Sequence, residues 1–341
     1  MKISSVTLGC VLSSVLLLAG VNSLVKKANN NGLVPIPNSK LELLKLIDNP
    51  KDPITDAKVE LGKKLYFDPR LSKSGLISCN TCHNLGLGGV DGVSAAIGNK
   101  WTPNPHHLNS PTVYNSVFFT AQFWDGRSPH LADQAKGPTL ASPEMAASPE
   151  HIEKVVKSMP EYVKEFQYAY NDGVKINFDK ITSTIAIFEK TLVTPSKYDD
   201  FLNGKADALN KAEKDGLNVF IDKGCASCHT GIALGGTMQP FELAGKYKFA
   251  NVGDFKGDKK GMVKTPTLRN ITETAPYFHN GEVWSLKDAI KQMGSIQLGI
   301  KISDKDAKRI EIFLKALKGR KPAISYPQLP ESTSTTPKPV D

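Results

Sequence analysis

Two short stretches of the sequence carry reactive residues at the same spacing. Residues 79–83 read C-N-T-C-H and residues 225–229 read C-A-S-C-H, so a histidine directly follows each pair of cysteines. C-x-x-C-H is the attachment signature of c-type haem, in which the two thiols bond to the porphyrin and the histidine is the proximal iron ligand. The two copies predict two covalently bound haem c groups, one held by Cys79, Cys82 and His83 and the other by Cys225, Cys228 and His229.

Other uses of paired cysteines explain these stretches less well. A disulfide is common in exported proteins, and C-x-x-C also occurs in zinc sites and redox-active dithiols. Zinc would need its four ligands closer together in sequence, and the βαβ pattern expected around a redox dithiol is not found. Neither a disulfide nor zinc accounts for the histidine after each pair. The fifth cysteine, Cys10, lies in an apolar leader, where it is most simply a small apolar residue.

The N-terminus indicates where the protein works. Residues 1–23 carry Lys2 near their start and then an apolar run from Val6 to Val21, which is typical of a secretory signal peptide; an uncleaved anchor is the alternative. We therefore expect a periplasmic protein.

The formal net charge is +9, but the basic residues are scattered except at 256–261, so we expect no nucleic-acid site. A mixed-sign solvated surface is the simpler interpretation, and a weak field that steers an acidic redox partner is the alternative.

The rest of the sequence predicts a mainly α fold, with two cytochrome c-like haem domains and long ordered loops. Apolar residues recur at helical spacing in 148–166, 178–194 and 303–319. The intervals 84–145 and 230–280 are rich in Gly, Pro and Asn and are expected to wrap the haems. The expected division is a signal peptide (1–23), an N-terminal haem domain (38–194), a C-terminal haem domain (195–320), a segment that packs back on the N-terminal domain (321–330) and a disordered tail (331–341).

The second axial position of each haem decides its chemistry. A methionine there raises the reduction potential and suits electron transfer, whereas an open position permits peroxide chemistry. Met238, Met262 and Met293 follow the second motif. Met238 follows too closely to reach round the ring easily, and spacing does not separate the other two. For any one of them, filling a core is the commoner use of methionine.

Several longer stretches resemble the bacterial di-haem cytochrome c peroxidases. They include CNTCHNLGLGGVDG from Cys79, NSPTVYNSVFFTAQFWDGR from Asn109, TPTLRNITETAPYFHNG from Thr265 and MGSIQLG from Met293, and the resemblance extends from about residue 40 to 330. It implies that the haem on His229 takes Met293 as its sixth ligand and receives electrons. It also implies that the haem on His83 is the peroxidatic one.

The resemblance also implies roles for residues outside the haem motifs. Trp124 matches a tryptophan between the haems, Glu144 matches the distal acid, and Gln134 matches a hydrogen-bonding partner in the distal pocket. His279 matches a histidine near a haem propionate. An interdomain Ca²⁺ site is implied at Asn109, Thr274 and Pro276, whose side-chain and backbone oxygens suit this hard cation.

One position departs from the family pattern. Most members have a histidine, in I-G-H-x-W, that caps the peroxidatic iron until the enzyme is half reduced, whereas this chain has Asn99. Two residues inserted downstream leave His106 and His107 in the same loop. Either histidine could replace the missing ligand, or the site could be permanently open.

The resemblance thus implies an enzyme that reduces H₂O₂ with electrons from a small cytochrome c or cupredoxin, usually as a homodimer. One alternative is a related di-haem oxidase that modifies a partner protein, but that branch uses a tyrosine where this chain has Met293. The other is an electron carrier in which both irons have two protein ligands.

Overall fold

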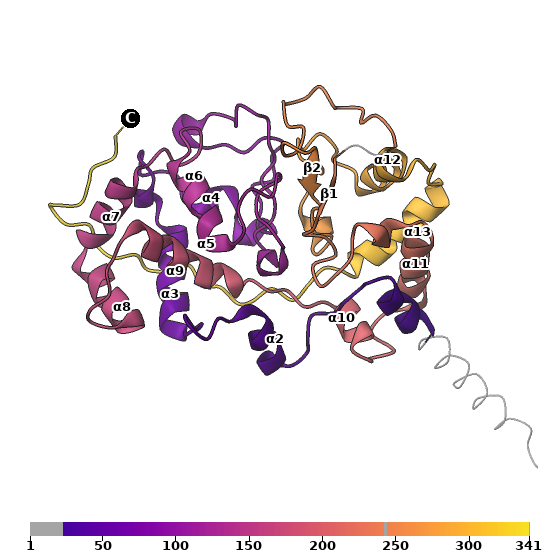
Figure 1. The fold of residues 1–341 in the computed structure, drawn as a ribbon, viewed down its shortest axis with the longest axis horizontal. Helices are drawn as coiled ribbons and strands as arrows, with labels where there is room; N and C mark the ends of the chain where they lie inside the picture. Colours follow the sequence, from indigo (N-terminus) through magenta and orange to yellow (C-terminus); the bar gives the residue numbers. More distant parts are fainter. Residues whose placement is uncertain (1–22, 242–243, 341) are drawn as a thin grey trace, which may run out of the picture.

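The computed structural model describes residues 23–241 and 244–340, and the expected signal peptide, apart from Ser23, lies outside them. The two halves of the chain lie side by side along the longest axis (Figure 1). The prediction of a mainly α fold is confirmed, because one short two-stranded sheet is the main extended element of the described chain. Within the same residues, no helix is long and apolar enough to cross a membrane.

Residues 23–30 are helical, and the further α-helices are α2 (Lys40–Ile47), α3 (Asp56–Phe67), α4 (Cys79–Cys82), α5 (Leu131–Gln134), α6 (Lys136–Leu140), α7 (Pro149–Lys157), α8 (Pro160–Tyr170), α9 (Phe178–Lys190), α10 (Lys197–Leu202), α11 (Lys211–Asp222), α12 (Leu286–Leu298) and α13 (Asp304–Lys315). Short 3₁₀ helices are η1 (Pro69–Leu71), η2 (Leu85–Leu87), η3 (Asn99–Trp101), η4 (Ser116–Phe118), η5 (Cys225–Ser227) and η6 (Ile271–Glu273). The antiparallel strands are β1 (Met238–Pro240) and β2 (Met262–Lys264).

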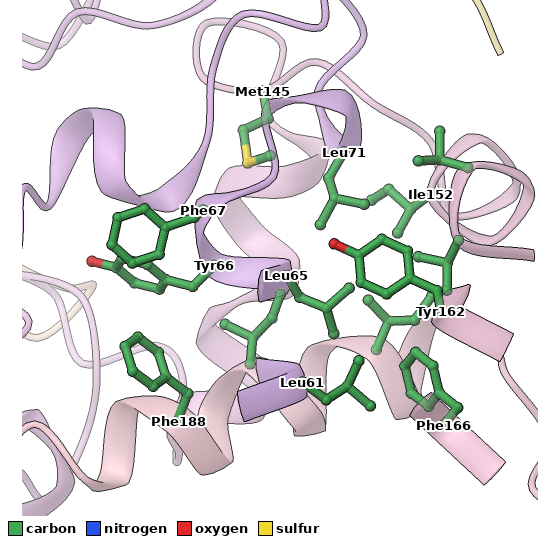
Figure 2. Packing of buried hydrophobic residues seen from close by; sticks show 14 of the residues in the cluster. Leu61, Leu65, Tyr66, Phe67, Leu71, Met145, Ile152, Tyr162, Phe166 and Phe188 are labelled. Atoms are coloured by element: carbon green, nitrogen blue, oxygen red, sulfur yellow. The ribbon is translucent and has the colours of Figure 1, made fainter. Parts of the chain in front are cut away.

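The N-terminal half packs around α3, the α-helix that comes before the first haem motif in the chain. Thr55 caps this helix, and its apolar side buries Leu61 and Leu65 (Figure 2). The helix crosses α9 closely at Gly62, where a Cβ would collide with the carbonyl oxygen of Thr184. Tyr66 and Phe188 meet edge to face at this crossing, with ring centroids 5.3 Å apart. The contact fixes the end of α3, from which the chain turns into the first motif.

The C-terminal half repeats this arrangement. Asn210 and Glu213 form a capping box at the start of α11. The helix crosses α13 at Gly216, where a Cβ would collide with the carbonyl oxygen of Arg309. Phe313 of α13 packs against Phe220, with centroids 5.3 Å apart. Each haem motif therefore follows a helix that a glycine allows to approach its partner helix closely.

Both ends of the described chain cross between the halves. Residues 23–33 pack on the C-terminal core, where Ala28 and Leu33 are buried. At the other end, the segment after α13 returns to the N-terminal half (Figure 1), and Tyr326 packs edge to face on Phe67.

The expectation of a disordered tail at 331–341 is corrected for the residues that the structure describes. Residues 331–340 run along the N-terminal half, where Thr333 donates to the Ser158 carbonyl over 2.9 Å. Arg70 donates to Ser332 over 3.0 Å, and the Val340 amide donates to the Lys73 carbonyl over 3.0 Å. The composition cannot form a core of its own, but its hydroxyl and backbone groups bind a surface already folded.

A buried ion pair joins three segments of the C-terminal half. The carboxylate of Asp199 accepts two hydrogen bonds from Arg269, at 2.8 and 2.9 Å, and both side chains are fully buried. It also accepts from the amides of Ile36 and Ser196, each over 2.7 Å. Burial alone would raise the pKa of Asp199, but the charge and hydrogen bonds of Arg269 outweigh it and the pKa is lowered.

Replacing Arg269 with Met should destabilise the protein by about 3–5 kcal/mol, because it leaves the buried Asp199 charge unpaired. Arg320→Met is the matched control, since Arg320 pairs with Asp200 at the surface and should cost no more than about 1 kcal/mol. Urea unfolding of the holoprotein measures both. Because the folded pKa of Asp199 is lowered, the pair's stabilisation is present above the unfolded pKa and lost as the pH falls through the folded pKa. Equal costs for the two variants would contradict this account.

Candidate haem sites

The first motif forms one turn of helix, α4, with His83 at its C-terminal end. The His83 amide donates to the Cys79 carbonyl over 2.9 Å. The imidazole Nδ1 lies 2.9 Å from the Pro111 carbonyl, so Nδ1 carries the proton and Nε2 is available to a metal. Burial lowers the pKa of His83, although the nearby Asp91 opposes the shift. A neutral imidazole oriented by a carbonyl is the form that binds iron.

The second motif repeats this geometry. It turns at Gly224, whose φ of 82° lies in the left-handed region that glycine adopts readily. The His229 amide donates to the Cys225 carbonyl over 3.1 Å, and Nδ1 lies 3.2 Å from the Leu234 carbonyl. Burial lowers the pKa of His229 to about 4. Both histidines therefore present Nε2 as the free nitrogen.

The cysteines of the two motifs are unpaired thiols in the structure. Burial raises the pKa of Cys82 to about 12 and that of Cys225 to about 11, so neither is a low-pKa redox thiol. Within residues 23–241 and 244–340, no three or more His, Cys, Asp or Glu side chains are grouped to hold a metal ion. The described chain thus offers neither the disulfide nor the zinc alternative and leaves the thiols available for haem attachment.

A large cavity lies against the second motif and opens to solvent. Together with the open space at its mouth it measures about 1500 Å³, and its wall includes Cys225, Cys228, His229 and Met293. Met238 and Met262, both described by the structure, are not part of this wall; the sulfur of Met238 lies against Gly126 instead. A largely apolar cavity with two thiols, an imidazole and a thioether fits a haem with His and Met ligands. The geometry therefore favours Met293 among the three methionines.

Trp124 lies on the wall of this cavity, where the two halves of the chain meet. Its indole donates to the Asn109 carbonyl over 3.0 Å, and its own carbonyl accepts from the Lys264 amide over 2.8 Å. His279 lies edge to face with Trp124 at 6.5 Å between ring centroids, and it packs against Phe241 as well. Burial lowers the pKa of His279 to about 4. These contacts hold Trp124 rigidly beside the C-terminal haem site.

The three residues of the implied calcium site all border the same cavity: Asn109, Thr274 and Pro276. The side-chain nitrogen of Asn109, Nδ2, donates to the Val93 carbonyl over 2.7 Å, so the side-chain oxygen, Oδ1, is the atom available to a cation. An amide oxygen and backbone carbonyls are acceptable Ca²⁺ ligands, so these residues fit the ion.

Glu144 lies close to the first motif, in the turn that follows α6. An added Cβ at Gly98 would lie 2.8 Å from the Glu144 Cα, and the Cys82 thiol lies 3.5 Å from the carbonyl oxygen of the adjacent Ile97. Burial raises the pKa of Glu144 itself, while Arg127 opposes the shift. Gln134 is half-buried at the end of α5, and α5 packs against α9. The structure thus brings Glu144 to the N-terminal site, whereas for Gln134 it gives only a place on a neighbouring helix.

Asn99 is bonded to the loop that carries Glu144. Its amide donates to the Pro143 carbonyl over 3.1 Å, and its side-chain nitrogen donates to the Ser142 carbonyl over 3.2 Å. The adjacent Gly98 lies so close that a Cβ there would collide with the Pro143 carbonyl oxygen. The residue that replaces the capping histidine therefore anchors the Glu144 loop.

The two histidines further along this loop bind carboxylates of the C-terminal half. His106 Nδ1 lies 2.9 Å from an oxygen of Asp254, and His107 Nε2 lies 3.0 Å from one of Glu282. Both pairs are at least partly exposed. In this arrangement the imidazoles join the two halves of the molecule, which supports the open-site alternative.

Replacing His106 or His107 with Asn should therefore leave the ligands of the iron at the His83 site unchanged. The expected result is the same absorption and electron paramagnetic resonance spectrum as the parent, for each variant and for the double variant. A conversion from a low-spin to a high-spin signal in either single variant would identify that histidine as the replacement ligand.

Lys264 and the two carbonyls that orient the histidines are site features that the sequence analysis missed. Lys264 is buried on the wall of the C-terminal cavity. The carbonyls belong to Pro111 and Leu234, and backbone acceptors leave no signal in residue type. Lys264 does leave one, since it stands directly before T-P-T-L-R-N, a stretch already identified as part of the site.

The chain is similar to known proteins along most of its length. Residues 56–207 match the family described as di-haem cytochrome c peroxidase. The cytochrome c551 peroxidase of Pseudomonas aeruginosa is 45% identical over 321 residues, covering 90% of each chain. That of Nitrosomonas europaea is 46% identical over 82% of this chain and 85% of its own. A solved MauG-like protein associated with microbial copper homeostasis aligns with a TM-score of 0.68 at 26% identity, over 80% of this chain and 92% of that one.

The fold and the two motifs define a di-haem c-type cytochrome. More specifically, the chain belongs to the di-haem cytochrome c peroxidase family, as its sequence predicted. Membership implies two haem c groups, and the residues described above fit them.

Proposed function

We propose that this protein reduces hydrogen peroxide in the periplasm, using electrons that a small cytochrome c or cupredoxin delivers one at a time. The reaction converts H₂O₂, two protons and two electrons to two molecules of water. The observation that carries the proposal is the difference between the two sites. Met293 lies on the wall of the C-terminal cavity, whereas a partly buried carboxyl, that of Glu144, lies in the turn that packs on Gly98 near the N-terminal motif.

The two haems would be held by equivalent residues but used differently. Cys225, Cys228 and His229 hold one, with Met293 as its second axial ligand; Cys79, Cys82 and His83 hold the other. A haem with two protein ligands transfers electrons, and one with a free axial position binds and reduces peroxide.

Glu144 is the group that moves protons in this proposal. Cleavage of the O–O bond requires a proton to pass from the oxygen nearer the iron to the leaving oxygen, and a single nearby carboxyl can accept and return it. Burial raises the pKa of Glu144 and so brings it closer to the working pH. Gln134 is proposed to orient the substrate by hydrogen bonding. Trp124, fixed by its bond to Asn109, lies where it can serve the passage of electrons between the halves.

The two alternatives make different demands on the same residues. A di-haem oxidase of the partner-modifying type would use a tyrosine at the position of Met293, which argues against it. An electron carrier would need a second protein ligand at the His83 haem. The two histidines that follow Asn99 in the same loop, His106 and His107, are hydrogen-bonded to Asp254 and Glu282 instead.

The decisive experiment measures H₂O₂ turnover with a reduced cytochrome donor, for fully oxidised enzyme and for enzyme pre-reduced by one electron. Equal turnover in both states is expected for an open site with Asn99. Turnover only after pre-reduction would support the peroxidase function but contradict the open site. No turnover in either state would reject the peroxidase and leave the electron carrier.

We further propose that Ca²⁺ binds at Asn109, Thr274 and Pro276 and that the protein is a homodimer. The calcium proposal rests on the fit of the three residues at one cavity wall. Isothermal titration with Ca²⁺ tests it, with Asn109→Ala as the variant expected to lose binding. Light scattering with and without the ion tests the oligomeric state.

A further inference from the structure

Three lysines of the described chain are almost completely buried, and one of them differs from the others. Lys58 pairs with Asp52 and Lys63 pairs with Glu60, each at 2.5–2.6 Å. Lys264 is only 4% exposed. Within residues 23–241 and 244–340, no carboxylate lies within ion-pairing distance of its Nζ. The nearest charged influence is Asp125, which is itself paired with Arg127 at 2.8 Å.

The surroundings of Lys264 tie it to the C-terminal haem cavity. It is the last residue of β2, and it lies on the cavity wall together with His229, Met293 and Trp124. Its ammonium group lies 4.6 Å from the ring centroid of Phe119, another wall residue. Its backbone amide is fixed to the Trp124 carbonyl over 2.8 Å.

A buried ammonium group without a counter-ion is expensive, because burial penalises the charged form. Burial lowers the pKa of Lys264 to about 7 in the protein alone. The contact with the face of Phe119 is a weak compensation compared with a carboxylate. The position therefore requires either loss of the proton or an anion that enters the cavity.

We propose that Lys264 is the counter-ion of a propionate carboxylate of the haem in the C-terminal cavity. This proposal rests on the haem that the family implies for that cavity. A haem carries carboxylates on one edge, and the cavity that receives it has this unpaired cation on its wall. Trp124 and Phe119 belong to the chain of the N-terminal half, so the pairing places the carboxylate edge toward that half.

The pairing gives Lys264 a role as a positioning and potential-setting residue. A fixed positive charge beside a haem favours the ferrous state over the ferric state, because the ferric iron carries one more positive charge. Lys264 thus raises the potential of the His229 haem. Its charge also acts at the other site, where it contributes to lowering the pKa of His83.

The test compares the holoproteins of Lys264→Met, Lys264→Arg and the control Lys63→Met in potentiometric titrations. Lys63 is equally buried, but its partner Glu60 is 62% exposed and loses little when it is left alone. We expect Lys264→Met to lower the equilibrium constant for reduction of the His229 haem at least tenfold, which is a fall of about 59 mV in the potential of a one-electron couple. Lys264→Arg should restore most of the potential, and Lys63→Met should leave it unchanged.

Haem content and thermal unfolding make the result independent of peroxidase activity. If each chain of the variant binds two haems and neither haem changes its potential, the proposal is wrong. A rise in the melting temperature of Lys264→Met would then show that the lysine had no counter-ion. A fall confined to the His83 haem would overturn the assignment to the C-terminal cavity. A fall at the His229 haem in a protein that does not turn over H₂O₂ would support the proposal and reject the peroxidase function instead.

Discussion

Replacing Glu144 with Gln is expected to lower kcat for H₂O₂ reduction by roughly 10²–10⁴-fold, the usual contribution of a positioned general acid or base. Glutamine has nearly the same shape as glutamate but cannot accept and return a proton. Because Glu144 lies in a tight turn and is not one of the residues that attach haem, the substitution should leave both haems bound. Stopped-flow and steady-state assays with reduced cytochrome measure the loss, and the visible spectrum checks the haems.

The pH profile separates proton transfer from a structural effect. Burial raises the pKa of Glu144, and only its carboxylate form can accept the first proton. Activity of the parent should therefore fall as the pH drops through this raised pKa, and Glu144→Gln should lose that limb of the profile. Glu150→Gln, an exposed change at the start of α7, is the matched control and should keep both kcat and the profile. A Glu144→Gln enzyme with parental turnover would remove the residue from the mechanism.

The haem motifs and the main helices could be predicted because their signals are local. C-x-x-C-H specifies its own chemistry, and the capping box at Asn210 places the start of α11 correctly. The helical pattern at 148–166 is divided in the structure into α7 and α8, because Pro160 lacks the amide that would continue the first helix. Local sequence thus predicted the kind of element and missed one break.

The parts that the sequence did not predict depend on contacts between distant segments. Residues 23–33 cross to the C-terminal core, where the Gly231 amide donates to the Gly32 carbonyl over 2.8 Å, next to His229. The C-terminal tail binds Ser158 and Lys73 although its composition is typical of disorder. Such partners are chosen by tertiary structure, and neither periodicity nor composition reports them.

The same limit applies inside the candidate site. Resemblance gave Glu144 and Met293; the structure has Met293 on the wall of the C-terminal cavity and Glu144 in the turn that packs on Gly98. The resemblance could not assign a role to Asn99, because the observed contacts of that residue are two hydrogen bonds, to the carbonyls of Pro143 and Ser142. The residue that departs from the family pattern is thus the one whose role required the fold.

Replacing Asn99 with His is expected to close the site that we propose is open in this chain. An imidazole can bind iron, whereas an asparagine amide is a poor ligand. Oxidised Asn99→His enzyme should therefore lose at least about tenfold in H₂O₂ turnover, a barrier increase of about 1.4 kcal/mol, and should recover after one-electron reduction. Turnover before and after pre-reduction measures the effect, together with the low-spin signal of the new ligand.

Asn99→Ala distinguishes ligation from loss of the loop anchor. It removes the hydrogen bond to Ser142 but adds no ligand, so any loss of activity should persist after pre-reduction. If Asn99→His and Asn99→Ala lose the same activity and neither recovers, the loop anchor alone explains the position. If Asn99→His stays fully active when oxidised, the loop bonded to Pro143 does not bring position 99 to the iron. The contrast between the two variants therefore tests whether a single side chain decides between a permanently open peroxidase and a reductively gated one.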